Sequence, residues 1–112
     1  MERGAVWLAE LPGPADSEPG YRRPYVIVSS NAYNQSRIRT IVAVALTSNL
    51  RLAYAPGNVL IAAADSGLPK DAVANVAQVV TVEKRFLIKR CGRLSSRTMK
   101  ALDNGLRLAL SL

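Results

Sequence analysis

The chain has 112 residues, 49% of them hydrophobic and 5% aromatic, which predicts one globular domain over residues 1–112 and excludes a disordered chain. Fifteen Lys and Arg residues against eight Asp and Glu residues leave a net charge of +7, which favours nucleic acid as a partner. A single cysteine and no histidine exclude an intrachain disulfide and a Cys/His zinc site, so we expect no metal and no cofactor.

Short β-branched runs bounded by turn residues predict a small, mainly β fold. The expected strands are Ala5 to Leu8, Tyr25 to Ser29, Thr40 to Leu46, Asn58 to Ala62, Ala74 to Val80 and Leu87 to Arg93. Residues 12–20 hold three prolines and two glycines, which predict an exposed loop. Asn31 to Asn34 predicts a turn or a single helical turn, and Ala64 to Gly67 a plain connection between strands.

The C-terminal segment changes to helical spacing behind Ser95 and Ser96, either of which could cap a first turn. One stripe of this helix comprises Met99, Leu102, Leu106 and Leu110, and a second comprises Ala101, Gly105, Leu108 and Leu112. Alternating leucines near the end would also fit a strand, but the Ala, Lys, Asp and Arg content favours a helix. We expect one stripe to pack on the core and the other on a second subunit.

Charged and hydroxyl side chains mark the ends of two expected strands. Arg23 and Pro24 directly precede the apolar run that starts at Tyr25, and Thr47, Ser48 and Asn49 close the next apolar run, Ile41 to Leu46. A guanidinium offers a planar fork that matches a phosphate, and a β-branched threonine holds its hydroxyl in few rotamers. The pattern predicts a phosphate site. The alternatives are a solvated strand end at Arg23 and a turn supported by the side chains of Thr47 to Asn49.

If the phosphate site binds RNA and cleaves it by attack of a 2′-hydroxyl, the reaction needs a base, a group that stabilises phosphoryl charge and a proton for the leaving oxygen. Because the chain lacks histidine, we assign Arg23 to charge stabilisation first and to protonation of the leaving group second. Glu18 is a candidate base on the loop, although a loop glutamate is usually only solvated. Tyr21 is the best placed aromatic residue for stacking on a base. Seven basic residues between Lys84 and Lys100 fit either an RNA backbone or a solvated face.

Residues 17–24, Ser-Glu-Pro-Gly-Tyr-Arg-Arg-Pro, and the run Val42 to Thr47 resemble the hallmark segments of the MazF/PemK (Kid) family of toxin ribonucleases. The resemblance implies an SH3-like β-barrel with a C-terminal helix that pairs into a twofold homodimer. It implies that Arg23 and Thr47 are the catalytic pair. Around them we place an RNA-binding set: Ser17, Glu18, Tyr21, Arg22, Ser48 and Asn49. Ser17 and Ala77 depart from the Kid pattern, which has histidine and an acidic residue there.

The family resemblance implies a toxin of a type II toxin–antitoxin system. Such a toxin is a sequence-specific, ribosome- and metal-independent endoribonuclease for single-stranded RNA, with messenger, ribosomal and transfer RNA all open as targets. A cognate MazE-like antitoxin would inhibit it. The alternatives are a nucleic-acid-binding barrel without catalysis and a CcdB-like gyrase inhibitor, which typically ends in Trp-Gly-Ile rather than Ala109 to Leu112. The apolar stretch after Met1 is too short for a signal peptide or a membrane span. We therefore expect a cytoplasmic protein.

Overall fold

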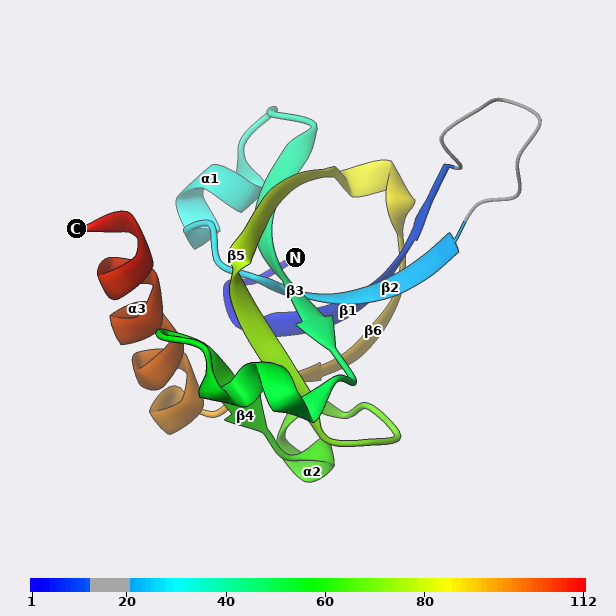
Figure 1. Ribbon diagram of the computed structural model, residues 1–112. Helices are drawn as coiled ribbons and strands as arrows, with labels where there is room; N and C mark the ends of the chain where they lie inside the picture. The colour runs from blue at the N-terminus through cyan, green and yellow to red at the C-terminus, as the bar shows by residue number, and fades with distance from the viewer. Residues whose placement is uncertain (13–20) are drawn as a thin grey trace.

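The computed structural model describes residues 1–12 and 21–112. Its sheet has six strands, all paired antiparallel, in the order β4-β5-β3-β2-β1-β6, and it curls strongly on itself (Figure 1). The strands are β1 (Ala5–Leu11), β2 (Tyr21–Ile27), β3 (Thr40–Thr47), β4 (Val59–Ile61), β5 (Ala72–Glu83) and β6 (Leu87–Arg93). The helical elements are α1 (Asn31–Gln35), η1 (Leu50–Tyr54), α2 (Ala63–Ser66), η2 (Lys84–Phe86) and α3 (Ser96–Leu110).

Both faces of the sheet are buried, which explains why its central strands are almost continuously apolar. Successive side chains on a strand point to opposite faces. Val26 and Val44 therefore contribute to a cluster that also contains Leu102 of α3. Tyr25 and Ala45, one position away on each strand, contribute to a second cluster on the other face. The curl of the sheet thus encloses one core, and α3 covers the other.

Helix α3 begins where the sequence predicts. The Ser95 hydroxyl caps it by accepting a hydrogen bond from the Thr98 amide. Asp65 of α2 fixes this end of the helix, because its carboxylate accepts hydrogen bonds from the Ser95 amide at 2.8 Å and the Thr98 hydroxyl at 2.5 Å. Leu102 is fully buried against the sheet. No helix within the described ranges has both the length and the apolar character needed to cross a bilayer.

Several expected boundaries need correction. The segment from Ala64 to Gly67 is not a plain connection: α2 occupies Ala63–Ser66 and ends at Gly67, whose positive φ of 79° favours glycine as a helix stop. Strands β1, β3 and β5 extend beyond their predicted limits, β2 begins four residues earlier and ends two residues earlier than predicted, β4 is shorter, and β6 matches its prediction. The expected loop at residues 12–20 lies outside the described residues except for Pro12. In the second stripe of α3, Leu108 and Leu112 are exposed, whereas Gly105 is buried.

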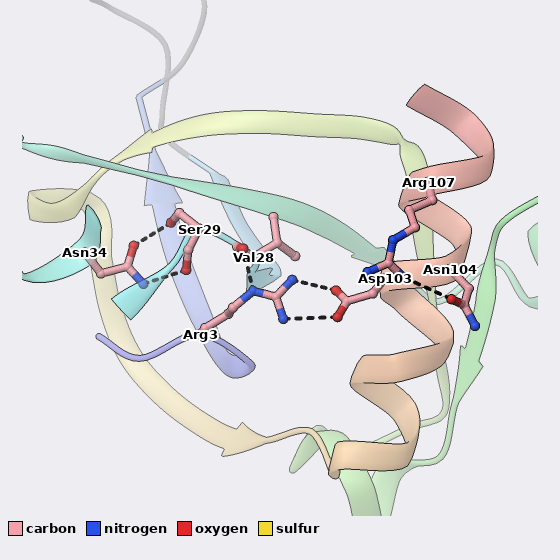
Figure 2. Close-up of polar contacts among 7 residues, drawn as sticks. All are labelled: Arg3, Val28, Ser29, Asn34, Asp103, Asn104 and Arg107. Atoms are coloured by element: carbon pink, nitrogen blue, oxygen red, sulfur yellow. Dashed lines mark hydrogen bonds and ion pairs between the residues drawn. The ribbon is translucent and has the colours of Figure 1, made fainter. Parts of the chain in front are cut away.

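The N-terminal segment is tied to α3 by Arg3, as Figure 2 shows. Its guanidinium donates two hydrogen bonds to the Asp103 carboxylate, the shorter at 2.5 Å, and its Nε donates to the Val28 carbonyl at 2.8 Å. The side chains of Arg3 and Asp103 are only 33% and 28% exposed, so water screens this pair incompletely. A single side chain therefore holds together three segments that are distant in the sequence.

Replacing Arg3 with methionine is expected to lower the free energy of unfolding by about 1–2 kcal/mol, because the Asp103 carboxylate and the Val28 carbonyl lose their donor. Arg90, whose pair with Glu2 is more exposed, provides the control. Arg90→Met should cost no more than about 0.5 kcal/mol. Urea unfolding of both variants measures the difference, and equal costs would contradict the role given to Arg3.

Candidate active site

Arg23 lies in β2 and is half-buried. It shares strand parity with Tyr25 and Ile27, so it is directed to the face of the sheet that carries the second cluster. There its guanidinium donates a hydrogen bond to the Gln78 side-chain oxygen of β5, at 3.4 Å. Among the described residues this is the one hydrogen bond of the guanidinium, and it is long, so most of the five N–H groups have no partner there that would compete with an anion.

The position of Gln78 depends on an irregularity in β5. Between the pairs Val44–Val79 and Leu46–Ala74, the residues from Asn75 to Gln78 face only Ala45 of β3. Such bulges bend a strand and redirect its side chains, and they are common beside active sites. The predicted set of site residues omits Gln78. A polar residue inside the apolar stretch from Ala74 to Val80 is the sequence signal that could have identified it.

Thr47 is the last residue of β3 and is half-buried. Strands β2 and β3 pair from Ile27–Ala43 to Tyr25–Ala45, where the ladder ends, so Arg23 and Thr47 each lie two residues beyond its last pair. The Thr47 hydroxyl oxygen accepts a hydrogen bond from the Asn49 amide at 3.2 Å. This bond orients the hydroxyl oxygen and leaves its proton free to bind an acceptor. The expected turn-supporting role of Thr47 is therefore present, and its contact with a phosphate stays a prediction.

A hollow of about 320 Å³ adjoins the end of β3. Thr47 and Ser48 border it, and its apolar walls include Pro24, Leu46, Leu68 and Pro69. Its volume is at the lower end of the range for small-molecule pockets. An apolar hollow beside two hydroxyl groups can accept a flat, partly polar chemical group. That group would belong to the same ligand as an anion bound by Arg23 and Thr47.

The other predicted site residues are distributed around this strand end. Tyr21 and Arg22 are the exposed first residues of β2, and Arg22 lies 3.8 Å from Glu10. Asn49 caps η1 by accepting a hydrogen bond from the Arg51 amide. Ser17 and Glu18 lie outside the described residues, and their roles stay predictions. Within the described ranges, no three His, Cys, Asp or Glu side chains are grouped so that they could hold a metal ion.

The phenol of Tyr25 is part of the buried surface beneath Arg23. Burial raises the pKa of Tyr25 above its ordinary value. The positive charge of Arg23 opposes this rise and the neighbouring Tyr21 adds to it, so the net direction is upward. The phenol therefore stays protonated and neutral at neutral pH.

Alkaline pH is expected to destabilise the protein through Tyr25. Its folded-state pKa is raised, so the unfolded chain loses this proton first, and stability declines once the pH passes the unfolded value of about 10. Urea unfolding between about pH 9 and pH 11 should show this decline, and Tyr25→Phe should flatten it. The same slope in both proteins would contradict the assignment.

The chain matches the sequence model of the PemK-like, MazF-like toxin of type II toxin–antitoxin systems over residues 2–110. It is 40% identical over 112 residues to Endoribonuclease MazF6 of Mycobacterium tuberculosis, covering all of this chain and 98% of that protein. A mycobacterial endoribonuclease solved with its cognate antitoxin superposes with a TM-score of 0.80 at 29% identity, covering 100% and 96% of the two chains. MazE–MazF of Deinococcus radiodurans, 19% identical over 100% and 96%, shares the fold with a TM-score of 0.82. These matches confirm the expected fold class, and the chain belongs to the PemK-like, MazF-like toxin family of type II toxin–antitoxin systems.

Proposed function

We propose that this protein is a toxin that cleaves single-stranded RNA at a short sequence motif without a metal ion or a ribosome. The ends of β2 and β3 support the proposal, because Arg23 and Thr47 each lie two residues beyond the last pair of that ladder, Tyr25–Ala45, and would bring a guanidinium and a hydroxyl group to the same phosphate. The 40% identical mycobacterial relative, which is named an endoribonuclease, supports it. Cytoplasmic RNA, with messenger RNA as the first candidate, would be the substrate.

In the proposed reaction, the 2′-hydroxyl oxygen attacks the adjacent phosphorus and the bond from phosphorus to the 5′-oxygen breaks. A base takes the proton of the 2′-hydroxyl, and the leaving 5′-oxygen receives a proton, which is the second role assigned to Arg23. The products are a 2′,3′-cyclic phosphate and a 5′-hydroxyl end. Arg23 donates hydrogen bonds to the phosphoryl oxygens as their negative charge increases, and Thr47 donates to one of them. Because both groups are held by packed strands, little reorganisation is needed in the transition state. Glu18 remains the candidate base.

Two partners belong to the same proposal. An antitoxin with an acidic, apolar-studded tail would cover the strand end and compete with RNA, in keeping with the 29% identical mycobacterial relative that was solved with its cognate antitoxin. A second copy of the chain would pack on the outer stripe of α3. Leu60 and Leu108, which are 57% and 65% exposed, border a hollow there and supply apolar surface for such a contact. Sedimentation equilibrium of the purified chain tests the homodimer.

The deciding experiment is incubation of the purified protein with a long single-stranded RNA in the presence of EDTA, followed by mapping of 5′-hydroxyl ends. A second substrate carries one 2′-deoxyribose at the mapped cleavage site. We expect discrete cleavage of the first RNA and binding without cleavage of the second, because the nucleophile is missing.

Other outcomes would select other functions. Binding of both RNAs without any cleavage would overturn the nuclease and favour a non-catalytic barrel. Inhibition of gyrase supercoiling without an effect on RNA would favour a gyrase poison. Cleavage that stops in EDTA and returns with a divalent cation would overturn the metal-independent mechanism.

A further inference from the structure

A second concave surface lies at the other end of β3 from Thr47. It is a hollow of about 490 Å³ between the segment that leads into β3 and the η2 turn after β5. In Figure 1 these segments lie at the end of the sheet near α1, away from α2. Its lining comprises Ser36, Arg37, Ile38, Arg39, Glu83, Lys84 and Arg85, and we name it the basic hollow.

Backbone contacts fix the position of the positive charge of Lys84. Its ammonium group donates hydrogen bonds to the Asn34 carbonyl at 2.6 Å and the Ser36 carbonyl at 3.2 Å. The Lys84 amide also donates to the Arg39 carbonyl, at 2.8 Å, which joins the two walls of the basic hollow. The charge is therefore held in place without a carboxylate partner on this ammonium among the described residues.

Three guanidinium groups complete the basic hollow. Arg85 stacks over the Phe86 ring at 4.8 Å and pairs with Glu83, the single carboxylate of the lining, at 2.8 Å. Arg37 and Arg39 are exposed, and neither side chain has a hydrogen-bond or ion-pair partner in the part of the chain that the structure describes. Four cations against one anion leave the lining with a net charge of +3.

Among the seven basic residues between Lys84 and Lys100, those on β6 are partly neutralised by a carboxylate. Arg90 and Arg93 both pair with Glu2, at 2.9 and 3.3 Å. The uncompensated guanidinium groups of Arg37 and Arg39 are therefore better placed to bind a polyanion than these residues of β6. Strand β3 rises about 3.3 Å per residue, so its seven steps separate the basic hollow from Thr47 by roughly 23 Å as measured along the strand.

We propose that the basic hollow binds backbone phosphates of RNA nucleotides that flank the cleaved motif. The identity of the polyanion as RNA rests on the proposed function. Guanidinium groups bind phosphate oxygens in pairs, and an RNA chain that passes Thr47 continues beyond the motif on both sides. Of the lining side chains only Ile38 is apolar, which favours a phosphate backbone over the apolar-studded tail of an antitoxin. The contact is independent of base sequence.

The test compares two RNAs made uncleavable by one 2′-deoxyribose at the cleavage site, one trimmed to the motif and one extended on both sides. The variant is the double substitution Arg37→Gln with Arg39→Gln. Arg97→Gln with Lys100→Gln is the matched control, because it removes the same charge from exposed positions of α3 outside the basic hollow. Fluorescence anisotropy measures each dissociation constant across a series of salt concentrations, and thermal melting checks the fold.

We expect the basic-hollow variant to bind the extended RNA about tenfold more weakly and the trimmed RNA unchanged. The slope of log affinity against log salt should become shallower by about 1.4, since each single-strand phosphate contact contributes about 0.7. The control pair should change neither quantity. Equal losses on the two RNAs, no loss, or the same loss in the control would each overturn the proposal.

Two further measurements distinguish RNA binding by the basic hollow from binding of an acidic polypeptide and from the proposed nuclease activity. Loss of affinity for a polyglutamate probe, with RNA affinity intact, would overturn it in favour of an acidic polypeptide. Cleavage of unmodified trimmed RNA reports on the catalytic site alone. If the protein never cleaves, a short and a long RNA of arbitrary sequence replace the trimmed and extended pair. Length-dependent binding that is lost in the basic-hollow variant would then support the basic hollow while overturning the nuclease, and absence of any RNA binding would overturn both.

Discussion

Replacing Arg23 with alanine is expected to lower kcat for RNA cleavage by a factor of about 10²–10³, the usual cost of removing one preorganised donor from a developing oxyanion. In the proposed mechanism the guanidinium contacts the phosphoryl oxygens most strongly when their charge is greatest, so kcat and kcat/KM should decline together. Arg23→Lys should recover only part of the rate, because an ammonium keeps the charge but lacks the planar fork.

The neighbouring Arg22 is the matched control for this prediction. It is exposed, it lies 3.8 Å from Glu10, and Arg22→Ala should change cleavage only a few-fold through RNA affinity. The hydrogen bond from Arg23 to Gln78 is long, so the Arg23→Ala protein should retain its melting temperature. Cleavage that persists at the parent rate in Arg23→Ala would remove the mechanism.

The start of β2 shows how far local sequence signals reach. Proline usually marks the beginning of a strand, and the sequence therefore predicts a strand that begins at Tyr25. In the structure β2 already begins at Tyr21, and Pro24 pairs with Leu8 of β1. The ladder to β3 ends at Tyr25, so the missing N–H of Pro24 faces no partner strand there. Strand length thus depends on which neighbour pairs at each position, and a single sequence does not contain that information.

Some features of the candidate site could likewise be predicted from the sequence, and others could not. Arg23 and Thr47 could be selected from the sequence because both follow from residue type and from their positions at the ends of apolar runs. Their alignment depends on the register of β2 and β3, and the contact with Gln78 depends on the bulge in β5. These are long-range features that local periodicity does not determine. The basic hollow likewise joins two segments more than forty residues apart, which the clustering of Lys84 to Lys100 alone did not reveal.

Substitution of Gly105 with alanine is expected to lower the free energy of unfolding by about 2–3 kcal/mol, as overpacking of a tight contact does. In most helices the same change is stabilising by about 1 kcal/mol, because alanine has the higher helix propensity. Here an added Cβ would overlap the Gly57 carbonyl oxygen, and the backbone around it cannot rotate away as a side chain would. Gly57 in turn has a positive φ of 83°, so this turn is held in a conformation that favours glycine.

The sign of this effect tests how α3 is attached to the sheet. Asn104→Ala, at the exposed neighbouring position, should change stability by no more than about 0.5 kcal/mol. Thermal melting should therefore separate the two variants by roughly 10 °C or more. A Gly105→Ala protein as stable as its parent would mean that α3 can shift outward without cost. Helix α3 would then be held mainly by Leu102 and the Arg3–Asp103 contact, rather than by its close approach to Gly57.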